Sequence, residues 1–299
     1  MIDREGIAAM EPSIRPYIRN TPVLDLDGTL LKLELLQVAG SFKARGAFAN
    51  LRTRTIPSAG VVAASGGNHG AAVAYAAAQL DIPCRIFVPE ISSPAKVERI
   101  RATGADLHIV AGAYPDALAA SIADATERRA MLVHAFDQAE TILGAGSLGK
   151  ELEEIGASFD TVLVPVGGGG LIAGVSAWFD GRVRVVGVEP EGAPTLDWAL
   201  RAGAPVTAPT GSIASDSLAA GALGSLVYPI VARYVERVVL VSDDDIRDAR
   251  QALWDRARIV AEPGGATAFA ALLSKKYEAA HGERVAVIVS GGNTVVTWI

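Results

Sequence analysis

Short runs of β-branched residues alternate with longer segments rich in alanine and leucine along most of the chain. The short runs predict β-strands, and the longer segments have the length and apolar spacing of helices. The predicted strands are 61–64, 85–88, 107–110, 132–134, 161–166, 184–189, 238–241 and 284–290. The predicted helices are 70–79, 94–103, 114–128, 143–154, 171–179, 243–258 and 265–275. A repeated strand-then-helix order favours an α/β fold, in which helices cover both faces of parallel sheets.

The composition excludes several classes of protein. The chain has 299 residues, half of them hydrophobic, which is enough for a large core and one or two domains. A net charge of −6 without a concentrated run of Lys and Arg argues against a nucleic-acid partner. No apolar run is long enough to span a membrane, and the first residues lack the features of a signal peptide. We therefore expect a cytoplasmic protein with no membrane partner.

The cysteine and histidine content gives no sign of a metal or redox centre. The single cysteine, Cys84, lies in a predicted strand, which is typical of a core residue. The four histidines are scattered and do not have the spacing of metal ligands. We expect no metal site.

Four consecutive glycines, Gly167–Gly170, follow the predicted strand 161–166 and precede the predicted helix 171–179. A loop without Cβ atoms can turn several backbone N–H groups toward one anion, and the helix N-terminus adds partial positive charge. The helix dipole contributes only about 0.3–1 kcal/mol in an open site, so the N–H donors must do most of the binding. The loop therefore predicts a phosphate site.

The glycine pattern leaves the identity of the phosphate open. Gly168, Gly170 and Ala173 fit the G-x-G-x-x-A pattern of dinucleotide-binding proteins. Glu189 ends the next predicted strand roughly 20 residues later, where an acid that binds the ribose would belong. No Lys-Ser or Lys-Thr pair follows the glycines, which excludes a Walker phosphate loop.

Two further glycine loops follow predicted strands. Ser65–Gly70 comes after the strand 61–64, and Ser290–Asn293 comes at the end of the strand 284–290. In open α/β sheets, ligands bind beyond the carboxyl ends of the strands. An ordinary strand-to-helix turn would explain any one of these loops, but three together indicate one shared crevice.

The segment Ser41–Ala47, with the sequence Ser-Phe-Lys-Ala-Arg-Gly-Ala, resembles the signature of the fold-type II pyridoxal-phosphate enzymes. The resemblance is to the threonine/serine dehydratase group, which includes serine racemase-like members. Four other segments resemble motifs of this family in the same order: Ser65–Gly70, Gly167–Gly170, Glu262–Ala266 and Ser290–Asn293. The resemblance covers nearly the whole chain. It implies a two-domain α/β fold like that of tryptophan synthase β, with residues 1–59 and 140–299 forming a large cofactor-binding domain and 60–139 a small one.

The same resemblance implies roles for individual residues. Lys43 would hold pyridoxal 5'-phosphate as a Schiff base and would then remove the Cα proton of the substrate. The glycine loop would bind the phosphate, Asn68 the ring 3-oxygen, and Ser290 the pyridine nitrogen. The other implied cofactor contacts are Phe42, Leu171 and Glu262. The implied substrate contacts are Ser65, Gly66, Gly67, Asn68 and His69. For His69, packing at the start of a helix is an open alternative.

The residue implied at the pyridine nitrogen predicts the reaction. A neutral hydroxyl at Ser290 does not stabilise a protonated ring as a carboxylate would, so the ring is a weaker electron sink. We therefore predict β-elimination from a small amino acid: L-threonine would give 2-oxobutyrate and ammonia, and L-serine would give pyruvate and ammonia. Gly66 replaces the serine of racemase-active relatives, so we expect little racemisation. The alternatives are a racemase, β-replacement or threonine synthase-like reaction of the same fold type and, more remotely, an NAD-dependent oxidoreductase.

Other positions depart from the family pattern. Relatives that bind a cation have a glutamate matching Glu189, but also an acid where this chain has Thr195, which supports the expectation of no metal. Ser217 and Ala39 replace common family residues and are expected to alter the shape of the pocket. The resemblance further implies a homodimer. Because the chain stops soon after Asn293, we expect no regulatory C-terminal domain.

Overall fold

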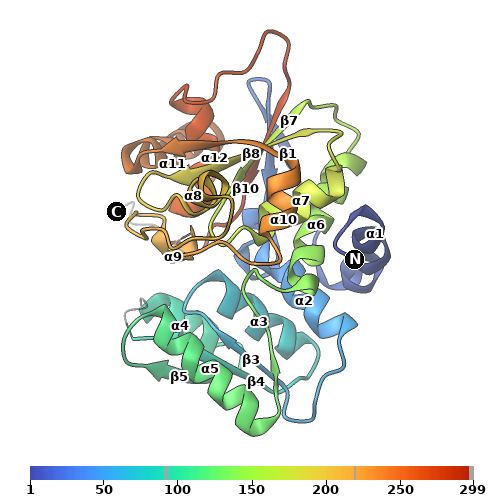
Figure 1. The fold of residues 1–299 in the computed structure, drawn as a ribbon, viewed down its shortest axis with the longest axis vertical. Helices are drawn as coiled ribbons and strands as arrows, with labels where there is room; N and C mark the ends of the chain where they lie inside the picture. The colour runs from blue at the N-terminus through green and yellow to red at the C-terminus, as the bar shows by residue number, and fades with distance from the viewer. Residues whose placement is uncertain (91, 93, 219, 296–299) are drawn as a thin grey trace.

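Two β-sheets organise the chain in a computed structural model that describes residues 1–90, 92, 94–218 and 220–295 (Figure 1). The strands are β1 (Val23–Leu26), β2 (Thr29–Leu33), β3 (Val61–Ala64), β4 (Cys84–Pro89), β5 (Asp106–Val110), β6 (Met131–Leu132), β7 (Thr161–Pro165), β8 (Arg184–Pro190), β9 (Val235–Val241) and β10 (Val285–Val289). The large sheet has the order β1-β2-β10-β7-β8-β9, and the small sheet has the order β5-β4-β3-β6. Among these strands, every neighbouring pair is parallel except β1 and β2.

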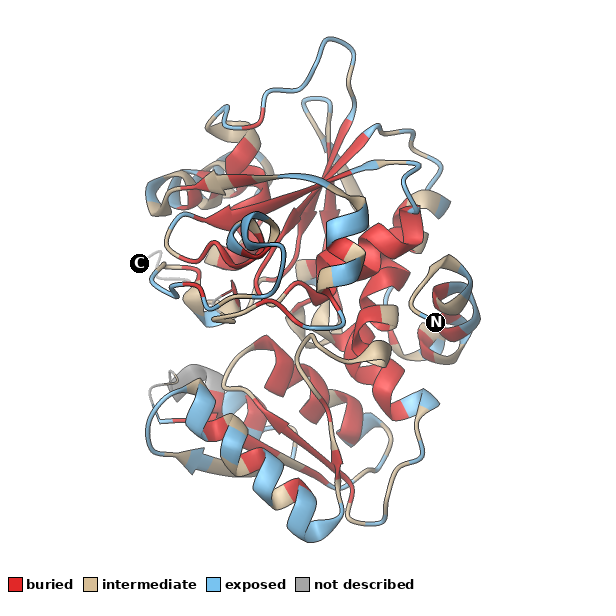
Figure 2. Ribbon diagram, in the orientation of Figure 1, coloured by how far each residue is buried: buried red, intermediate tan, exposed pale blue. Residues whose placement is uncertain are grey.

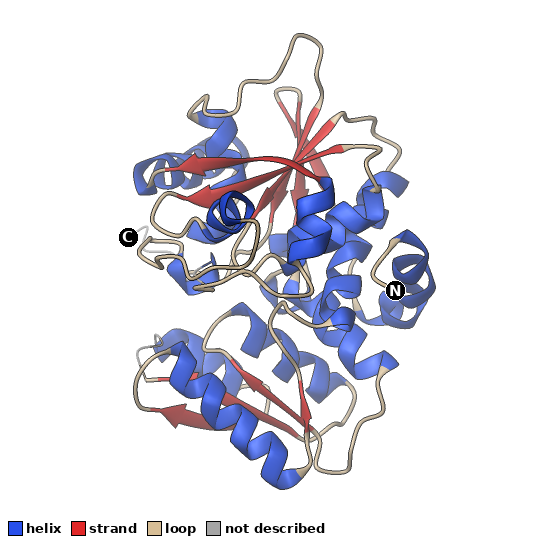
Figure 3. Ribbon diagram, viewed as in Figure 1, coloured by secondary structure: helices blue, strands red, loops and turns tan. Residues whose placement is uncertain are grey.

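Helices flank both sheets, as Figure 3 shows. They are α1 (Arg4–Ile14), α2 (Lys43–Thr53), α3 (Asn68–Gln79), α4 (Pro94–Arg101), α5 (Tyr114–Arg128), α6 (Ala139–Glu154), α7 (Gly170–Phe179), α8 (Thr195–Ala202), α9 (Ser215–Leu218), α10 (Tyr228–Tyr234), α11 (Asp243–Ala257) and α12 (Pro263–Leu273). The predicted α/β class with parallel-rich sheets is confirmed.

Both faces of the inner strands β7 and β10 of the large sheet are buried, which explains why these strands are continuously apolar. Side chains alternate between the faces of a strand. In β7, Val162 and Val164 therefore pack in one core with α6 and α7, while Leu163 packs in another with α11 and α12. In β10, Ala286 and Val287 are divided between the same two cores. Figure 2 shows the central strands buried along their length.

The small sheet is covered on both faces in the same way. Val61 and Ala63 of β3 pack with α3, while Val62 and Ala64 pack in a smaller cluster with α5. Cys84 lies in β4 as a buried free cysteine, as the sequence predicted, and burial raises the pKa of its thiol to about 12. A thiol held neutral in this way is a packing residue and not a nucleophile.

The hairpin of β1 and β2 is the main element that the sequence-based prediction missed. The two strands are antiparallel and are joined by Asp27 and Gly28, whose φ angles of 50° and 86° lie in the left-handed region. An Asp-Gly pair between two short apolar runs is a strong signal for a two-residue hairpin turn. The helices α1, α2, α8, α9 and α10 were also not delimited from the sequence. In the described part of the chain, none of the helices is both long and apolar enough to cross a membrane.

Candidate active site

Lys43 is the first residue of α2 and lies against the end of β10. The backbone N–H of Phe42 donates to the carbonyl oxygen of Ser290 at 3.1 Å, and Ser41 forms an isolated antiparallel bridge with Gly291. These bonds hold the segment before Lys43 beside the Ser-Gly-Gly-Asn loop. The two motifs are far apart in the sequence, and this contact brings them to one place.

The side chain of Lys43 is partly buried, and its amine has no ion pair to a described carboxylate. Nζ donates to the carbonyl oxygen of Ala135 at 2.7 Å. Nζ also lies 5.1 Å from the centre of the Phe42 ring. Burial lowers the pKa of Lys43 to about 8, because desolvation disfavours the ammonium form. An amine in this state is suited to act as a nucleophile and a base near neutral pH.

The four glycines form the turn between β7 and α7. Gly169 has φ +85°, in the left-handed region, and a Cβ on Gly168 would overlap the ring of Phe136. A Cβ on Gly167 would lie 2.7 Å from the carbonyl oxygen of Leu218. The conformation and the close packing thus both require glycine at these positions.

The backbone N–H groups of this loop fit an anion. Within the described residues, the N–H groups of Gly167, Gly168 and Gly169 donate to no protein atom. Gly170 and Leu171 begin α7, where the first N–H groups of a helix have no partner inside the helix. Because backbone N–H groups that are removed from water require partners, this set of donors matches the phosphate predicted from the sequence.

Asn68, Glu262 and Ser290 come together from three different elements. Asn68 begins α3, and its Nδ2 donates to Oε1 of Glu262, which precedes α12, at 2.5 Å. Ser290 follows β10 and is 4% exposed, and its hydroxyl donates only a long bond of 3.5 Å, to the carbonyl oxygen of Gly264. A buried hydroxyl with such a weak bond can still pair with a ring nitrogen.

The loop Ser65–Gly67 is partly buried and leads into α3. The hydroxyl of Ser65 accepts from the N–H of Gly67 at 3.0 Å, which closes a local turn. The ring of His69 is buried, and its Nε2 lies 3.0 Å from the carbonyl oxygen of Val133. Burial, together with the nearby Lys43, lowers the pKa of His69 to about 3, so the ring is neutral and donates through Nε2. These contacts favour the packing interpretation that the sequence left open for His69.

The sequence-based site did not include α9, which lies against three of its glycine motifs. A Cβ added to a glycine of each motif would approach or overlap one residue of α9. The pairs are Gly67 with Asp216, Gly264 with Ser217, and Gly167 with Leu218. The sequence identified Ser217 only as a departure from the family pattern. A four-residue helix has too little periodicity for its position to be read from sequence.

Glu189, the residue considered for a ribose or a cation, caps a helix. Its two carboxylate oxygens accept from the N–H groups of Leu196 at 2.7 Å and Asp197 at 3.0 Å in the first turn of α8. Burial raises the pKa of Glu189 to about 8. The described residues contain no cluster of three or more His, Cys, Asp or Glu suited to a metal.

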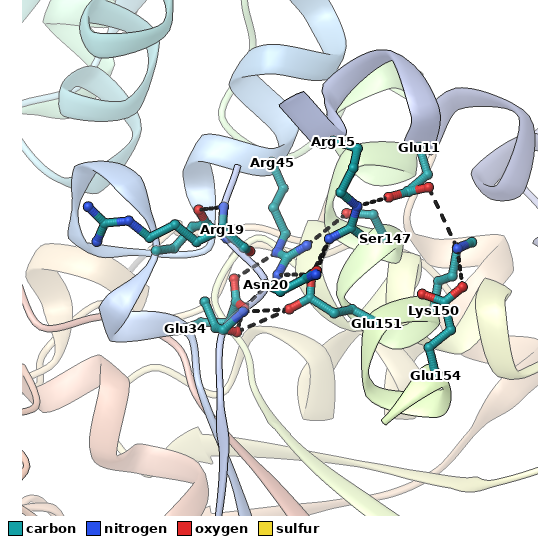
Figure 4. A network of polar contacts seen from close by, with 12 residues as sticks. Glu11, Arg15, Arg19, Asn20, Glu34, Arg45, Ser147, Lys150, Glu151 and Glu154 are labelled. Atoms are coloured by element: carbon teal, nitrogen blue, oxygen red, sulfur yellow. Dashed lines mark hydrogen bonds and ion pairs between the residues drawn. The ribbon is translucent and has the colours of Figure 1, made fainter. Parts of the chain in front are cut away.

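A cluster of buried charges forms around Arg45, which lies in α2 two residues after Lys43; Figure 4 shows Arg45 with Glu34 and Glu151. Arg45 is fully buried and donates to both carboxylate oxygens of Glu34 at 2.7 Å, and to Glu151 at 3.0 Å. Lys32, also fully buried, donates to Glu151 at 2.5 Å. Although burial opposes it, the charges of Arg45 and Lys32 lower the pKa of Glu151 to about 2. This buried charge cluster joins β2, α2 and α6 at the first turn of the helix that begins with Lys43.

The family model that matches the chain is described as "Pyridoxal-phosphate dependent enzyme" and covers residues 14–291. A phenylserine dehydratase from Ralstonia pickettii is 38% identical over 98% of this chain and 93% of its own. An L-threonine ammonia-lyase from Geobacter sulfurreducens is 37% identical over 90% of this chain and 68% of its own. A serine racemase from Oryza sativa subsp. indica is 34% identical over 97% of this chain and 91% of its own.

Solved structures are similar over the whole fold. The structure of maize serine racemase matches with a TM-score of 0.93 and 32% identity, covering 98% of this chain and 94% of that one. A T.th. threonine deaminase matches with a TM-score of 0.90 and 34% identity, covering 99% of both chains.

Proposed function

We propose that this chain, which belongs to the pyridoxal-phosphate dependent enzyme family, is an ammonia-lyase that converts an L-β-hydroxy amino acid to a 2-oxo acid and ammonia. The β-hydroxyl leaves as water, and one water is taken up again when the released imine is hydrolysed. The cofactor of the chain is pyridoxal 5'-phosphate, which resolves the choice that the glycine pattern left open. The observation that carries the proposal is the partly buried amine of Lys43, which has a lowered pKa and no ion pair to any described residue. It donates to Ala135, and the next residue, Phe136, packs on the glycine loop, whose N–H groups donate to no described residue.

The residues of the chain supply binding and proton transfer. Pyridoxal 5'-phosphate, when bound, supplies an electron sink for the electrons released at the substrate Cα. The N–H groups of Gly167–Gly170 bind its phosphate without a mobile cationic side chain. Ser290 offers a hydroxyl to the ring nitrogen, and Asn68 offers an N–H to the ring oxygen. With a pKa of about 8, about one Lys43 amine in ten is neutral at pH 7 and can accept the Cα proton.

The lowered pKa of Lys43 predicts the pH dependence of cofactor attachment. Only the neutral amine reacts with an aldehyde, so attachment to the stripped chain is expected to accelerate with rising pH and to level off above about pH 8. Stopped-flow absorbance between about pH 6.5 and 9.5 measures this rate, with Nα-acetyl-lysine as the control amine of ordinary pKa. A rate that still rises about tenfold per pH unit at the upper end of this range would contradict the assigned environment.

A substrate panel tests the proposed function. The purified holoenzyme is mixed with L-phenylserine, L-threonine and L-serine, and the 2-oxo acid and ammonia are measured. We expect equal amounts of the two products from at least one of these amino acids, since elimination releases one of each. Ranking kcat/KM across the panel identifies the preferred side chain. If none of the three gives a 2-oxo acid, the lyase proposal fails.

One observation favours racemisation as a second candidate function. A Cβ on Gly66 would overlap the hydroxyl of Ser92, so this hydroxyl occupies the space that a serine side chain at position 66 would need. Racemisation requires a proton donor besides Lys43. Chiral chromatography of the same reactions measures D-amino acid. If the Ser92→Ala variant loses D-isomer formation and keeps 2-oxo acid formation, Ser92 supplies that second proton.

A further inference from the structure

We propose that Asn293 is a positioning residue, which fixes the amide of Asn68 so that one N–H points into the cofactor site. The inference rests on the proposed placement of Asn68 at the cofactor. Nδ2 of Asn293 donates to Oδ1 of Asn68 at 2.7 Å and to the carbonyl oxygen of Ala39 at 2.8 Å. Oδ1 of Asn293 accepts from the guanidinium of Arg99.

These contacts allow only one orientation of the Asn293 amide. A side-chain amide has two N–H donors on its nitrogen and only acceptor sites on its oxygen. Rotating the Asn293 amide by 180° would place its oxygen against two other oxygens, those of Ala39 and Asn68, and its nitrogen against Arg99. Every partner of Asn293 opposes that rotation. Gly40 makes room for the arrangement, because a Cβ there would overlap Oδ1 of Asn293.

The fixed amide of Asn293 determines the orientation of Asn68. Because Oδ1 of Asn68 accepts from Asn293, its Nδ2 is directed toward Glu262, to which one N–H is donated. The second N–H of Nδ2 has no partner among the described residues, although Asn68 is only 8% exposed. A buried donor without a partner is costly, so this N–H is the one available to the cofactor.

Asn293 also joins parts of the fold that meet at the site. Ala39 lies in the segment that leads to Lys43, Asn68 begins α3, and Arg99 lies in α4. The orientation of Asn68 therefore depends on how the helices of the small sheet sit against the Lys43 segment. Glu262 holds the other end of the Asn68 amide, so losing Asn293 is expected to weaken this orientation and not to abolish it.

Asn293→Asp is the sharpest variant. Aspartate has the size of asparagine and can keep Arg99 as a partner, but it places carboxylate oxygens against Ala39 and Asn68. We expect the dissociation constant of pyridoxal 5'-phosphate, titrated into the stripped full chain, to rise about tenfold. Asn293→Ser keeps one hydrogen-bond donor, so its dissociation constant for pyridoxal 5'-phosphate is expected to rise less. Asn20→Asp, at an exposed position away from this network, is the matched control and is expected to bind like the parent.

A double-mutant cycle tests whether Asn293 acts through Asn68. In an Asn68→Ala background, the Asn293→Asp change is expected to raise the dissociation constant less than about threefold. An equally large rise in both backgrounds, or no rise in either, would overturn the proposal. Thermal melting identifies variants that fail to fold. If Asn293→Asp does not fold, the same cycle is measured with Asn293→Ser in its place, and the same outcomes support or overturn the proposal. Cofactor binding is measured without substrate, so a chain that turns over no β-hydroxy amino acid but retains the Asn293–Asn68 coupling refutes only the proposed function.

Discussion

Replacing Lys43 with alanine is expected to reduce turnover of the preferred amino acid by at least about 10³-fold, because in the proposed mechanism this one side chain supplies both the covalent link and the base. The visible absorption of the covalently held cofactor is expected to disappear from the purified variant. The proposed phosphate site at Gly167–Gly170 does not involve this side chain, so the variant is expected to bind pyridoxal 5'-phosphate reversibly. Steady-state kinetics, absorbance and equilibrium dialysis measure the three quantities.

Lys276→Ala is the matched control for that experiment. Lys276 forms surface ion pairs with Glu191 and Asp245 and lies far along the chain from Lys43. Because exposed ion pairs contribute about 0–1 kcal/mol, this variant is expected to keep its activity and its absorbance. Primary amines added to Lys43→Ala are expected to restore part of the activity. Lys43→Ala with near-parental turnover would exclude the assigned role.

Replacing Arg45 with methionine is expected to lower the free energy of unfolding by about 3–5 kcal/mol. Methionine preserves much of the side-chain volume, but it leaves the buried carboxylates of Glu34 and Glu151 with Lys32 as their remaining fully buried cation. An uncompensated buried charge costs more than the hydrogen bonds that are lost. Urea denaturation at a fixed cofactor concentration measures the effect, because bound cofactor itself stabilises the fold.

The pH dependence of the Arg45→Met effect identifies its cause. Without the guanidinium, the folded variant holds a carboxylate whose pKa is higher than in the unfolded chain, so the folded state binds more protons. Stability of the variant then falls as pH rises above about 4.5, and the deficit relative to the parent shrinks toward acidic pH. The double variant Arg45→Met/Glu34→Gln is expected to recover at least about 1 kcal/mol. A cost below about 1 kcal/mol for the single variant, independent of pH, would contradict the role of the buried charge cluster.

The sequence by itself predicted the α/β class, most of the inner strands and the family. The reason is that continuous apolar runs such as β7 arise wherever a strand is buried on both faces, whatever its neighbours are. Motifs such as Gly167–Gly170 and Ser41–Ala47 can also be recognised from sequence, because all the residues of each motif are adjacent in the chain. The antiparallel β1–β2 hairpin was missed although Asp27 and Gly28 signal its turn.

Only the tertiary structure decided which side chains of these motifs meet. Asn68 and Glu262 are 194 positions apart, and Asn68 and Asn293 are 225 apart, yet their amides and carboxylate form one network. The tertiary structure also decided that Arg45 pairs with both Glu34 and Glu151. It likewise decided that α9 packs against glycines of three separate motifs. Local propensity carries no information about such pairs, because a hydrogen bond between distant residues depends on how whole elements pack. The sequence therefore determined which chemistry the chain carries, and the packing of two sheets determined how its polar groups are paired and oriented.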